Sequence, residues 1–393
     1  MNTVGDFFDF QNGYAFKSKD FLNQGKYKII RIKELKDGLV KFFSDTVYID
    51  DADCNIYKYM VEKGDVLFAL TGDPVSKSNP LSWVGRVSYY EHDEPALLNQ
   101  RVCKAIAKAD ISKEFLYYFF RQEKEFYSLA SKATGSASQA NISTKTLEQH
   151  NFQFFDRDTC NKIVGVLLSL DEKIELNNKI NKNLEQQARA MFKSRFINFE
   201  PFGGNMPNAW HISTVSEIIE FHDSKRIPLS SRERANLDKI YPYYGATSIM
   251  DYVDRYLFDG IYLLLGEDGT VVDDKGLPIL QYVEGKFWVN NHAHILTGKN
   301  GFNVELLYLL FSLTSVKAIV TGAVQPKISQ TNLNRIPVVI PSNDELQQFD
   351  GYIQPIFAEI RSLRAENARL AEIRDNLLPK LMSGEIDVSN LDF

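Results

Sequence analysis

The sequence contains few cysteines and no long apolar run, and both shortages limit what the protein can be. Its three cysteines, Cys54, Cys103 and Cys160, are scattered and show no Cys-x-x-Cys spacing. This pattern indicates reduced thiols and argues against a disulfide framework or a zinc site. No apolar run approaches the roughly 20 residues that span a bilayer, and residues 1–6 lack a basic signal-peptide start. We therefore expect the protein to stay in the cytoplasm.

A surplus of positive charge is also missing. The formal net charge of −6 argues against a protein that coats nucleic acid by bulk attraction. A local basic face is still compatible with this charge, because Tyr14–Lys41 holds eight basic and three acidic residues. Residues 30–33 alternate apolar and basic side chains, so the same segment also fits an ordinary solvated strand face. Both interpretations stay open at this point.

Common catalytic and cofactor-binding motifs are absent. The chain has no Gly-x-x-x-x-Gly-Lys-Ser/Thr phosphate loop, no His-Glu-x-x-His zinc motif and no Gly-x-Ser-x-Gly nucleophile turn. It also lacks the Asn/Asp-Pro-Pro-Tyr/Phe tetrapeptide with which adenine methyltransferases hold the target amino group. His292 and His294 form the one close histidine pair, and no third metal ligand is apparent beside them. These absences predict a binding protein that is not an enzyme and that holds neither a metal nor a cofactor of its own.

A long heptad pattern occurs twice in the chain. Between Asp158 and Phe196, seam residues recur at alternating spacings of four and three, which is typical of a coiled-coil helix. The pattern returns without a gap 186 positions later, between Asp344 and Met382. A helix of about 38 residues is about 57 Å long and buries one narrow stripe, so we expect the two copies to pair. The seam positions are Ile163, Leu167, Leu170, Ile174, Asn177, Asn181, Leu184, Ala188 and Met191, and then Phe349, Ile353, Ile356, Ile360, Leu363, Asn367, Leu370, Arg374 and Leu377.

Each copy carries an amide at one equivalent seam position, Asn181 in the first and Asn367 in the second. A buried amide contributes little stability, but it penalises slipped registers because only one alignment satisfies it. We interpret the two asparagines as residues that set the register of the helix pair. The alternative is that both amides are solvated where the helices splay apart.

The repeat extends beyond the helices, which indicates a duplicated domain. Thr134–Ser143 matches Thr321–Ser329 after one inserted residue, and Glu114–Phe120 matches Glu305–Phe311. A period near 190 residues is far longer than that of solenoid repeats. Each half therefore predicts short strands and turns, then a helix, a polar loop and the long helix. The expected strands are Tyr27–Leu35, Val66–Leu70 and Trp83–Tyr90 in the first half, and Ile261–Leu265, Thr270–Val272 and Phe287–Val289 in the second.

The predicted fold class is mixed α/β (α+β). It has two globular domains and two paired long coiled-coil helices, related by an internal repeat. Prolines and glycines between the halves predict a linker. The expected boundaries are a first domain at 1–156, a helix at 157–196, a linker at 197–209, a second domain at 210–342, a helix at 343–382 and a tail at 383–393.

Polar loops are the first candidates for ligand contacts. Thr71–Asn79 and Thr134–Asn141 are rich in small hydrogen-bonding residues. Glutamine and asparagine can pair with adenine, while serine and backbone amides can reach phosphate. The same composition is also typical of ordinary surface turns. The return of the second loop's pattern in Thr321–Ser329, next to the second long helix, favours a shared use.

Five motifs together resemble the DNA specificity subunit of type I restriction-modification enzymes, and the resemblance covers nearly the whole chain. The motifs are Gly13–Phe21, Asp171–Asn177, Tyr243–Asp254, Leu265–Gly269 and Leu378–Ile386. The resemblance implies a non-catalytic subunit whose two target-recognition domains each read one half of a split DNA sequence. The resemblance further implies that the paired helices run antiparallel, within an internal pseudo-twofold repeat, and hold these domains apart.

The resemblance also implies partners. These are double-stranded DNA, two modification subunits with adenine N6-methyltransferase chemistry and S-adenosylmethionine, and restriction subunits that complete an ATP- and magnesium-dependent nuclease. One feature departs from the family pattern. The second half begins with Met206–Trp210, similar to the family's Leu-Pro-x-x-Trp start, whereas the first half starts directly at Val4. We therefore expect the start of the first domain to be held differently, against the tail Ser383–Phe393.

The candidate DNA contacts combine cations for phosphates with Gln, Arg and Thr for base edges. In the first domain they are Lys17, Lys19, Thr71, Ser76, Lys77, Arg101, Ser138 and Gln139. In the second they are Lys225, Arg226, Tyr244, Thr247, His292, Gln325 and Lys327. We expect the length and register of the helices to set how many unread base pairs lie between the half-sites. The alternatives are a coiled-coil scaffold or regulatory protein that binds no DNA, and a self-contained modification enzyme.

Overall fold

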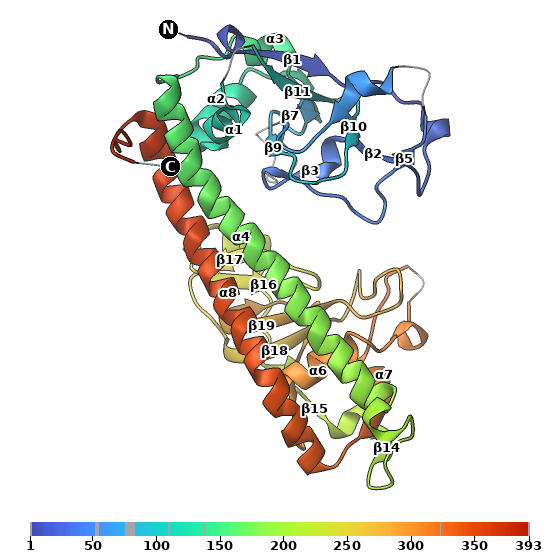
Figure 1. Ribbon diagram of the computed structural model, residues 1–393. Coiled ribbons are helices and arrows are strands. Elements are labelled where there is room, and N and C mark those ends of the chain that lie inside the picture. The colour runs from blue at the N-terminus through green and yellow to red at the C-terminus, as the bar shows by residue number, and fades with distance from the viewer. Residues whose placement is uncertain are drawn as a thin grey trace. The chain divides into compact units, whose positions relative to one another are not determined.

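The computed structural model describes residues 2–51, 55–74, 83–108, 111–136, 138–322 and 324–391. The chain forms two compact units, and each unit combines distant parts of the sequence. Unit 1 comprises Met1–Ile174 with Ala368–Phe393, and unit 2 comprises Glu175–Asn367. Two long helices, α4 (Arg157–Phe192) and α8 (Asn343–Ser383), give one part of their length to each unit (Figure 1).

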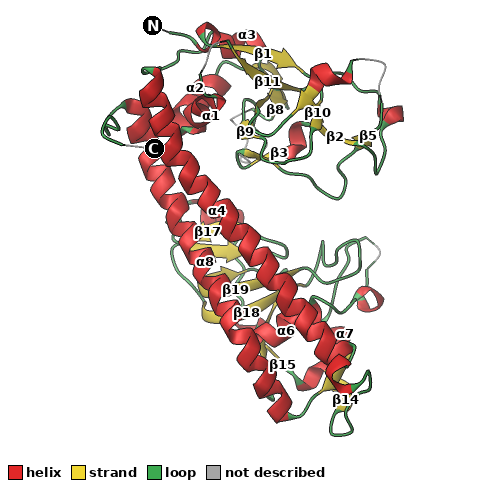
Figure 2. Ribbon diagram, in the orientation of Figure 1, coloured by secondary structure: helices red, strands yellow, loops and turns green. Residues whose placement is uncertain are grey.

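Unit 1 is a mixed unit of short strands and short helices, followed by α4 (Figure 2). Its six-stranded sheet has the order β1 (Phe8–Asn12), β11 (Val102–Ala107), β7 (Val66–Ala69), β9 (Val87–Tyr89), β4 (Leu39–Val40) and β3 (Leu35–Lys36). The other strands are β5 (Tyr48–Ile49), β2 (Tyr27–Ile30), β10 (Ala96–Leu98) and β6 (Met60–Val61) in one sheet, and β12 (Thr134–Ser136), β13 (Gln139–Asn141) and β8 (Thr71–Gly72) in another. The helices are α1 (Lys113–Arg121), α2 (Glu123–Ala130) and α3 (Thr144–Glu148).

The core of unit 1 forms where α1 packs against the six-stranded sheet. Residues 115–120 of α1 are all buried, and the Ser112 side chain caps the helix by accepting a hydrogen bond from the Phe115 amide. Parts of α4 and α8 complete the same core. Tyr118 of α1 donates a hydrogen bond of 2.8 Å to Asp171 of α4, and Asp171 also pairs with Arg374 of α8 at 2.5 Å. Unit 1 therefore needs both ends of the chain.

Unit 2 repeats this plan with longer strands. Its six-stranded sheet has the order β15 (Ile219–Phe221), β20 (Ala293–Gly298), β18 (Phe258–Gly266), β19 (Leu280–Val289), β16 (Tyr241–Tyr244) and β17 (Ile249–Val253). The remaining elements are the strand pair β14 (His211–Thr214) and β21 (Pro337–Ile340) and the helices α5 (Ser231–Ala235), α6 (Val304–Phe311) and α7 (Gln330–Asn334). The almost fully buried α6 takes the place that α1 has in unit 1.

The linker segment is packed rather than open. A π-helical turn, η6 (Lys193–Ile197), follows α4, and Phe199, Phe202 and Met206 lie against the core that contains Trp210. The rings of Phe202 and Trp210 are 5.1 Å apart at an angle of 73°. Apolar side chains therefore fix the path from α4 into the strands of unit 2.

The long helices run antiparallel within each unit. In unit 2, Asn177 donates hydrogen bonds of 2.8 Å to Asn367 and to Glu366. In unit 1, the Asp171–Arg374 pair follows the same alignment. The same alignment places Asn181 opposite Leu363, because Asn181 lies four residues after Asn177 and Leu363 lies four residues before Asn367. Residues that are equivalent in the repeat are 186 positions apart. They are not the residues that face each other in the antiparallel pair.

The two proposed register residues consequently have different surroundings. Asn367 is bonded to Asn177 and also donates to Asn178 at 2.9 Å. Asn181 is 7% exposed, and its Oδ1 has no hydrogen-bond partner among the described residues. The seam residue that is hydrogen-bonded to Asn367 is thus Asn177. The residue equivalent to Asn177 in the second copy of the repeat is Leu363.

Three expected strands are wrong in their extent. The strand expected at Tyr27–Leu35 ends at Ile30, because the buried Glu34 carboxylate accepts the Arg31 amide and turns the chain into the 3-10 helix η3 (Ile32–Glu34). The strand expected at Trp83–Tyr90 begins only at Val87, and residues 270–272 form no strand beyond a single bridge from Val272 to Pro278.

The start of the chain is held by two kinds of contact. The Val4 amide donates to the His150 carbonyl at 2.9 Å. The Val4 side chain also belongs to the same apolar core cluster as Val388 of the tail.

Cys103 and Cys160 are buried free thiols, and Cys54 lies outside the described residues. Burial raises the pKa of both described thiols, to about 11 for Cys160, which keeps them protonated and unreactive at neutral pH. In the part of the chain that the structure describes, no helix has the length and apolar character needed to cross a bilayer.

Candidate nucleic-acid interface

A polar hairpin stands at one edge of unit 1. Strands β12 and β13 pair with each other, and β13 also pairs with β8. Gly135 has a φ of +145°, and a Cβ at this position would lie 2.2 Å from the Gln139 carbonyl oxygen. Only glycine fits there, so the hairpin backbone depends on the Thr-Gly motif. Thr71 is buried and donates a hydrogen bond of 2.8 Å to Asn141, which fastens the hairpin to β8.

Unit 2 has the same hairpin at the same position of its fold. Thr321 and Lys327 form an antiparallel bridge, and Gly322 has a φ of +88° with the Gln325 carbonyl oxygen 2.2 Å from its Cβ position. In both units a serine after the hairpin caps the next short helix, Ser143 for α3 and Ser329 for α7.

Backbone hydrogen bonds show that the two hairpins are structurally equivalent. The Ile142 amide donates to the Leu70 carbonyl at 2.9 Å, and the Ile328 amide donates to the Glu267 carbonyl at 2.8 Å. Leu70 follows β7 and Glu267 follows β18, the strands that pair with β11 and β20. Each hairpin therefore stands at the end of a central strand of its own sheet. Loops in such places often carry binding residues on a rigid support.

The structure brings only some first-domain candidates together. Ser138 and Gln139 are exposed on the hairpin, and Thr71 is fastened to its base. Arg101 is exposed in the turn before β11, and its carbonyl accepts the Leu70 amide, so this turn adjoins the base of the hairpin. Lys17 caps the 3-10 helix η2 (Ser18–Asp20) and Lys19 lies within it; both are exposed, and this helix is far from the hairpin in sequence. The candidates Ser76 and Lys77 lie outside the described residues.

In the second domain, three candidates gather around two acids. Arg226 pairs with Glu267 at 2.6 Å, Lys327 pairs with the other Glu267 oxygen at 3.1 Å, and His292 pairs with Asp268. Lys225 and Thr247 are exposed. Tyr244 lies near the same turn, since its carbonyl accepts the Asn290 amide, and burial raises the pKa of its hydroxyl. Gln325 is exposed at the hairpin.

Arg226 has surroundings that set it apart from the other cations. Its side chain is 15% exposed, and it also donates to the Ala293 carbonyl at 2.9 Å and to the Asp223 carbonyl at 3.1 Å. A guanidinium with this many internal partners holds the surrounding backbone in place. A direct contact with phosphate would require several of these bonds to break, so the geometry favours a supporting role.

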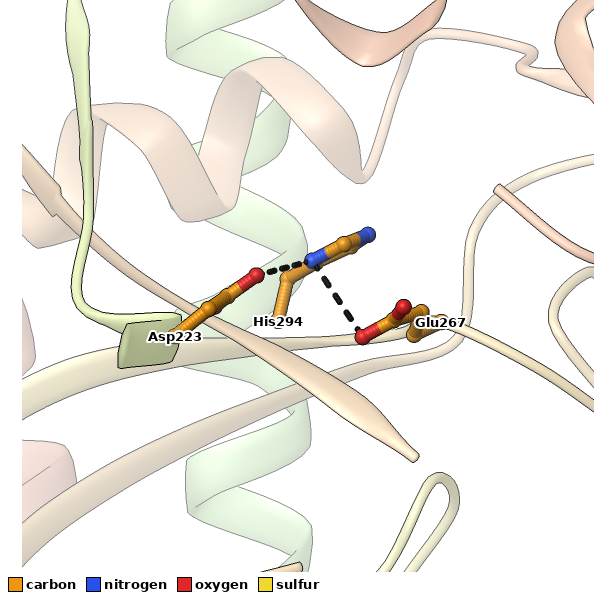
Figure 3. A group of neighbouring side chains, drawn as sticks. All are labelled: Asp223, Glu267 and His294. Atoms are coloured by element: carbon orange, nitrogen blue, oxygen red, sulfur yellow. Dashed lines mark hydrogen bonds and ion pairs between the residues drawn. The ribbon is translucent and has the colours of Figure 1, made fainter. Parts of the chain in front are cut away.

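A buried charged cluster lies beneath the second hairpin, and sequence reasoning missed two of its three members. Asp223, Glu267 and His294 have ligand atoms within 4.8 Å of one another, and Figure 3 shows the two carboxylates on either side of one imidazole nitrogen. The sequence presents His294 only as half of a histidine pair with His292. The signal that could have found the cluster is an acid within two residues of the end of each strand that flanks the histidine strand, Asp223 after β15 and Glu267 after β18.

Hydrogen bonds and charges set the ionisation of these acids. Burial alone would raise the pKa of Asp223, but His294, the Ile295 amide and Gln330 outweigh it and lower that pKa. Burial likewise opposes the shift at Glu267, whose pKa is lowered by Arg226, His294 and Lys327. Two side-chain cations already pair with these carboxylates, and both His294 nitrogens already face oxygens. The donor set therefore fits an internal ion-pair cluster better than a metal centre.

Comparisons with known proteins agree with this duplicated architecture. The family model of the type I restriction modification DNA specificity domain matches residues 1–186 and again 207–373. The MjaIX specificity subunit of a type I restriction enzyme from Methanocaldococcus jannaschii is 25% identical over 326 residues, covering 76% of this chain and 74% of that protein. The HindI specificity subunit from Haemophilus influenzae is 21% identical, covering 84% of this chain and 88% of that protein.

A solved structure also shares the fold. The S subunit of a type I restriction-modification system from M. genitalium matches with a TM-score of 0.53 and 19% identity, over 97% of this chain and 95% of that one. The mixed two-domain fold predicted from the sequence is therefore confirmed. Because the family model accounts for most of the sequence in two successive matches, the chain belongs to the family of type I restriction-modification DNA specificity subunits.

Proposed function

We propose that this chain recognises a bipartite DNA sequence and that each unit reads one half of it. Membership of the specificity family supports the coarse function, a sequence-specific recognition subunit without catalytic chemistry of its own. The observation that carries the finer proposal is the equivalent polar hairpin in each unit, with Gln139 and Gln325 exposed at matching places. Glutamine can pair bidentately with adenine in the major groove, whereas exposed lysines such as Lys19 and Lys225 can hold phosphates.

The long helices have two parts in this proposal. Their paired length would set the number of unread base pairs, and their outer faces would dock two modification subunits. Large apolar side chains outside the paired seam support the docking role: Leu176 is 52% exposed, Ile180 37% and Ile373 40%. S-adenosylmethionine would then be held by the modification subunits, and ATP with magnesium by the restriction subunits.

Mapping N6-methyladenine across the host genome, with and without this gene, tests the recognition function. We expect one bipartite methylated motif to disappear when the gene is deleted and to return when it is restored. Survival of every methylated motif after deletion would overturn the proposal.

A binding measurement tests the same function in vitro. The chain in complex with its modification subunits should protect the mapped motif, and its affinity should fall steeply as salt rises, because phosphate contacts release counterions. A duplex with both half-sites scrambled is the control. Equal affinity for the two duplexes at every salt concentration would contradict sequence-specific reading.

A further inference from the structure

The buried cluster of unit 2 is centred on a histidine that meets an acceptor at both ring nitrogens. Nδ1 of His294 lies 2.6 Å from Oδ2 of Asp223, and Nε2 lies 2.8 Å from the Ile328 carbonyl oxygen. An ionised carboxylate and a carbonyl can only accept hydrogen bonds, and a neutral imidazole has one N–H to give. His294 is 1% exposed, so water does not replace a missing bond. An imidazolium satisfies both contacts.

Several contacts join this cluster to the hairpin segment 321–330. His294 meets the Ile328 carbonyl, Lys327 pairs with Glu267, and the Gln330 amide donates to Asp223 at 2.5 Å. Asp223 is fixed from the other side, because its Oδ1 accepts the Ile295 amide at 2.9 Å. The cluster thus connects strand β20 to the backbone just after the exposed Gln325.

Unit 1 has no such cluster at the matching positions. Strand registers place Cys103 where unit 2 has His294, since Cys103 pairs with Phe68 as His294 pairs with Leu265. Leu70 is equivalent to Glu267, because their carbonyls accept the matching amides of the two hairpins. Asn12 pairs with Cys103 and is therefore equivalent to Asp223. The first hairpin is instead fastened by the neutral Thr71–Asn141 hydrogen bond.

We propose that His294, as an imidazolium bound to Asp223, is a positioning residue that holds the second hairpin in its reading conformation, and that unit 1 has no counterpart of this control. The inference rests on the proposed function and adds an asymmetry to it. Discrimination at the second half-site depends on the charge of a buried histidine, whereas discrimination at the first does not.

Other charged groups around the histidine do not account for such a dependence. Asp223, Glu267, Arg226 and Lys327 face it or its partners, and the lowered pKa of the two acids keeps both ionised throughout the neutral range. His222 bonds to Thr297 and lies beside Lys225. The exposed His292 bonds to Asp268 and is the nearest group that needs a separate control.

The experiment uses the full chain with its modification subunits and the mapped bipartite duplex. Affinity is compared with that for duplexes carrying one changed base pair in the first or in the second half-site. His294→Gln should lower second half-site discrimination by roughly 10-fold relative to the wild type, as expected for losing a buried charge-assisted hydrogen bond. First half-site discrimination should change less than about two-fold.

Matched variants separate positioning from general damage. Asp223→Asn should lower second half-site discrimination as His294→Gln does, because it removes the partner of the same hydrogen bond. His292→Gln and the exposed His211→Gln should behave as the wild type. Unchanged discrimination at the second half-site in His294→Gln, or an equal loss at both half-sites, would overturn the proposal.

A spectroscopic measurement on the wild type keeps the proposal testable if the variants fail to fold. In the full chain labelled with 15N-histidine, one of the six rings should donate a hydrogen bond from both nitrogens, and this signal should be lost in Asp223→Asn. Absence of such a ring would contradict the imidazolium. Absence of any sequence-specific binding would instead defeat the proposed function, whereas intact binding with unchanged second half-site discrimination in His294→Gln defeats only this inference.

Discussion

Two asparagines on α4, Asn177 and Asn181, have different surroundings in the helix pair. The Nδ2 of Asn177 donates to two partners on α8, whereas the register sets buried Asn181 opposite the apolar Leu363. The Oδ1 of each asparagine is buried without a hydrogen-bond partner among the described residues, so the donated bonds are what distinguish Asn177. A buried polar atom without a partner costs about 1–3 kcal/mol, while an apolar replacement of similar shape removes that cost. The two asparagines should therefore respond to mutation in opposite directions.

Replacing Asn181 with leucine should raise the free energy of unfolding by about 1 kcal/mol, because the unpartnered Oδ1 is removed and more apolar area is buried at a position opposite Leu363. Replacing Asn177 with leucine should lower it by about 1–3 kcal/mol, since Asn367 and Glu366 lose a buried donor. Urea unfolding of the full chain measures both. Destabilisation of similar size by the two substitutions would show that Asn181 has a partner in solution.

The acids of the buried cluster give unit 2 a defined response to acid. The pKa of Asp223 and of Glu267 is lowered in the folded state from ordinary values of 3.8 and 4.5. A lowered folded-state pKa stabilises the protein above the unfolded value, and this stabilisation is lost as the pH falls through the folded value. Thermal melting followed from neutral pH downwards should therefore show unit 2 losing stability below about pH 4.5.

Asp223→Asn should make this loss shallower, because one of the two acids no longer binds a proton on unfolding. Asp238→Asn provides the control, since Asp238 is exposed and no side-chain hydrogen bond is formed by it in the described part of unit 2. An unchanged slope in Asp223→Asn would mean that the carboxylate contributes nothing to the acid response.

At the scale of elements, the two hairpins depend on one glycine each. Gly135→Ala should disturb the first hairpin and Gly322→Ala the second, because each added Cβ would meet a carbonyl oxygen at 2.2 Å. Each variant should relax the specificity of one half-site by roughly 10-fold or more while the other half-site is kept. Methylation mapping in cells carrying each variant measures this.

Gly351→Ala on α8 is the matched control, since no atom lies within 4 Å of the added Cβ. It should leave both half-sites unchanged. Loss of specificity at both half-sites in Gly135→Ala or in Gly322→Ala would contradict independent reading by the two units.

The elements also show which features a sequence can predict. The long helices follow from a heptad period kept over many turns, and their seam residues, such as Ile163 and Ile353, are buried as expected. Strands were less predictable because most are short, and local hydrogen bonds such as that of Glu34 end them. The charged cluster escaped prediction because Asp223, Glu267 and His294 are far apart in sequence, and a histidine within an apolar strand resembles a core residue.

At the scale of the whole molecule, the helices are the proposed determinant of half-site spacing. Inserting four residues after Leu176 alone should change the spacer, but it also shifts the seam out of phase. Inserting seven residues after Leu176 and seven after Asn367 keeps the heptad phase and the antiparallel pairing. This adds about 10 Å, so we expect the unread gap to widen by about three base pairs at 3.4 Å each.

Methylation mapping of the paired insertion checks this expectation, and the half-sites themselves should be unchanged. The single insertion after Leu176 is the comparison, because it should lower stability as well as alter the gap. Altered half-sites with an unchanged gap in the paired insertion would show that the helices do not act as a spacer.

Unit 1 is built from two separate parts of the chain, and this determines when it can fold during synthesis. Its core requires Leu378, Leu381, Met382 and Val388, which are synthesised after all of unit 2. Unit 2 is contained within Glu175–Asn367 and can close earlier. The first half of the chain to be synthesised is thus the last to complete its core, and until then its apolar α4 seam remains open to chaperones or to premature pairing.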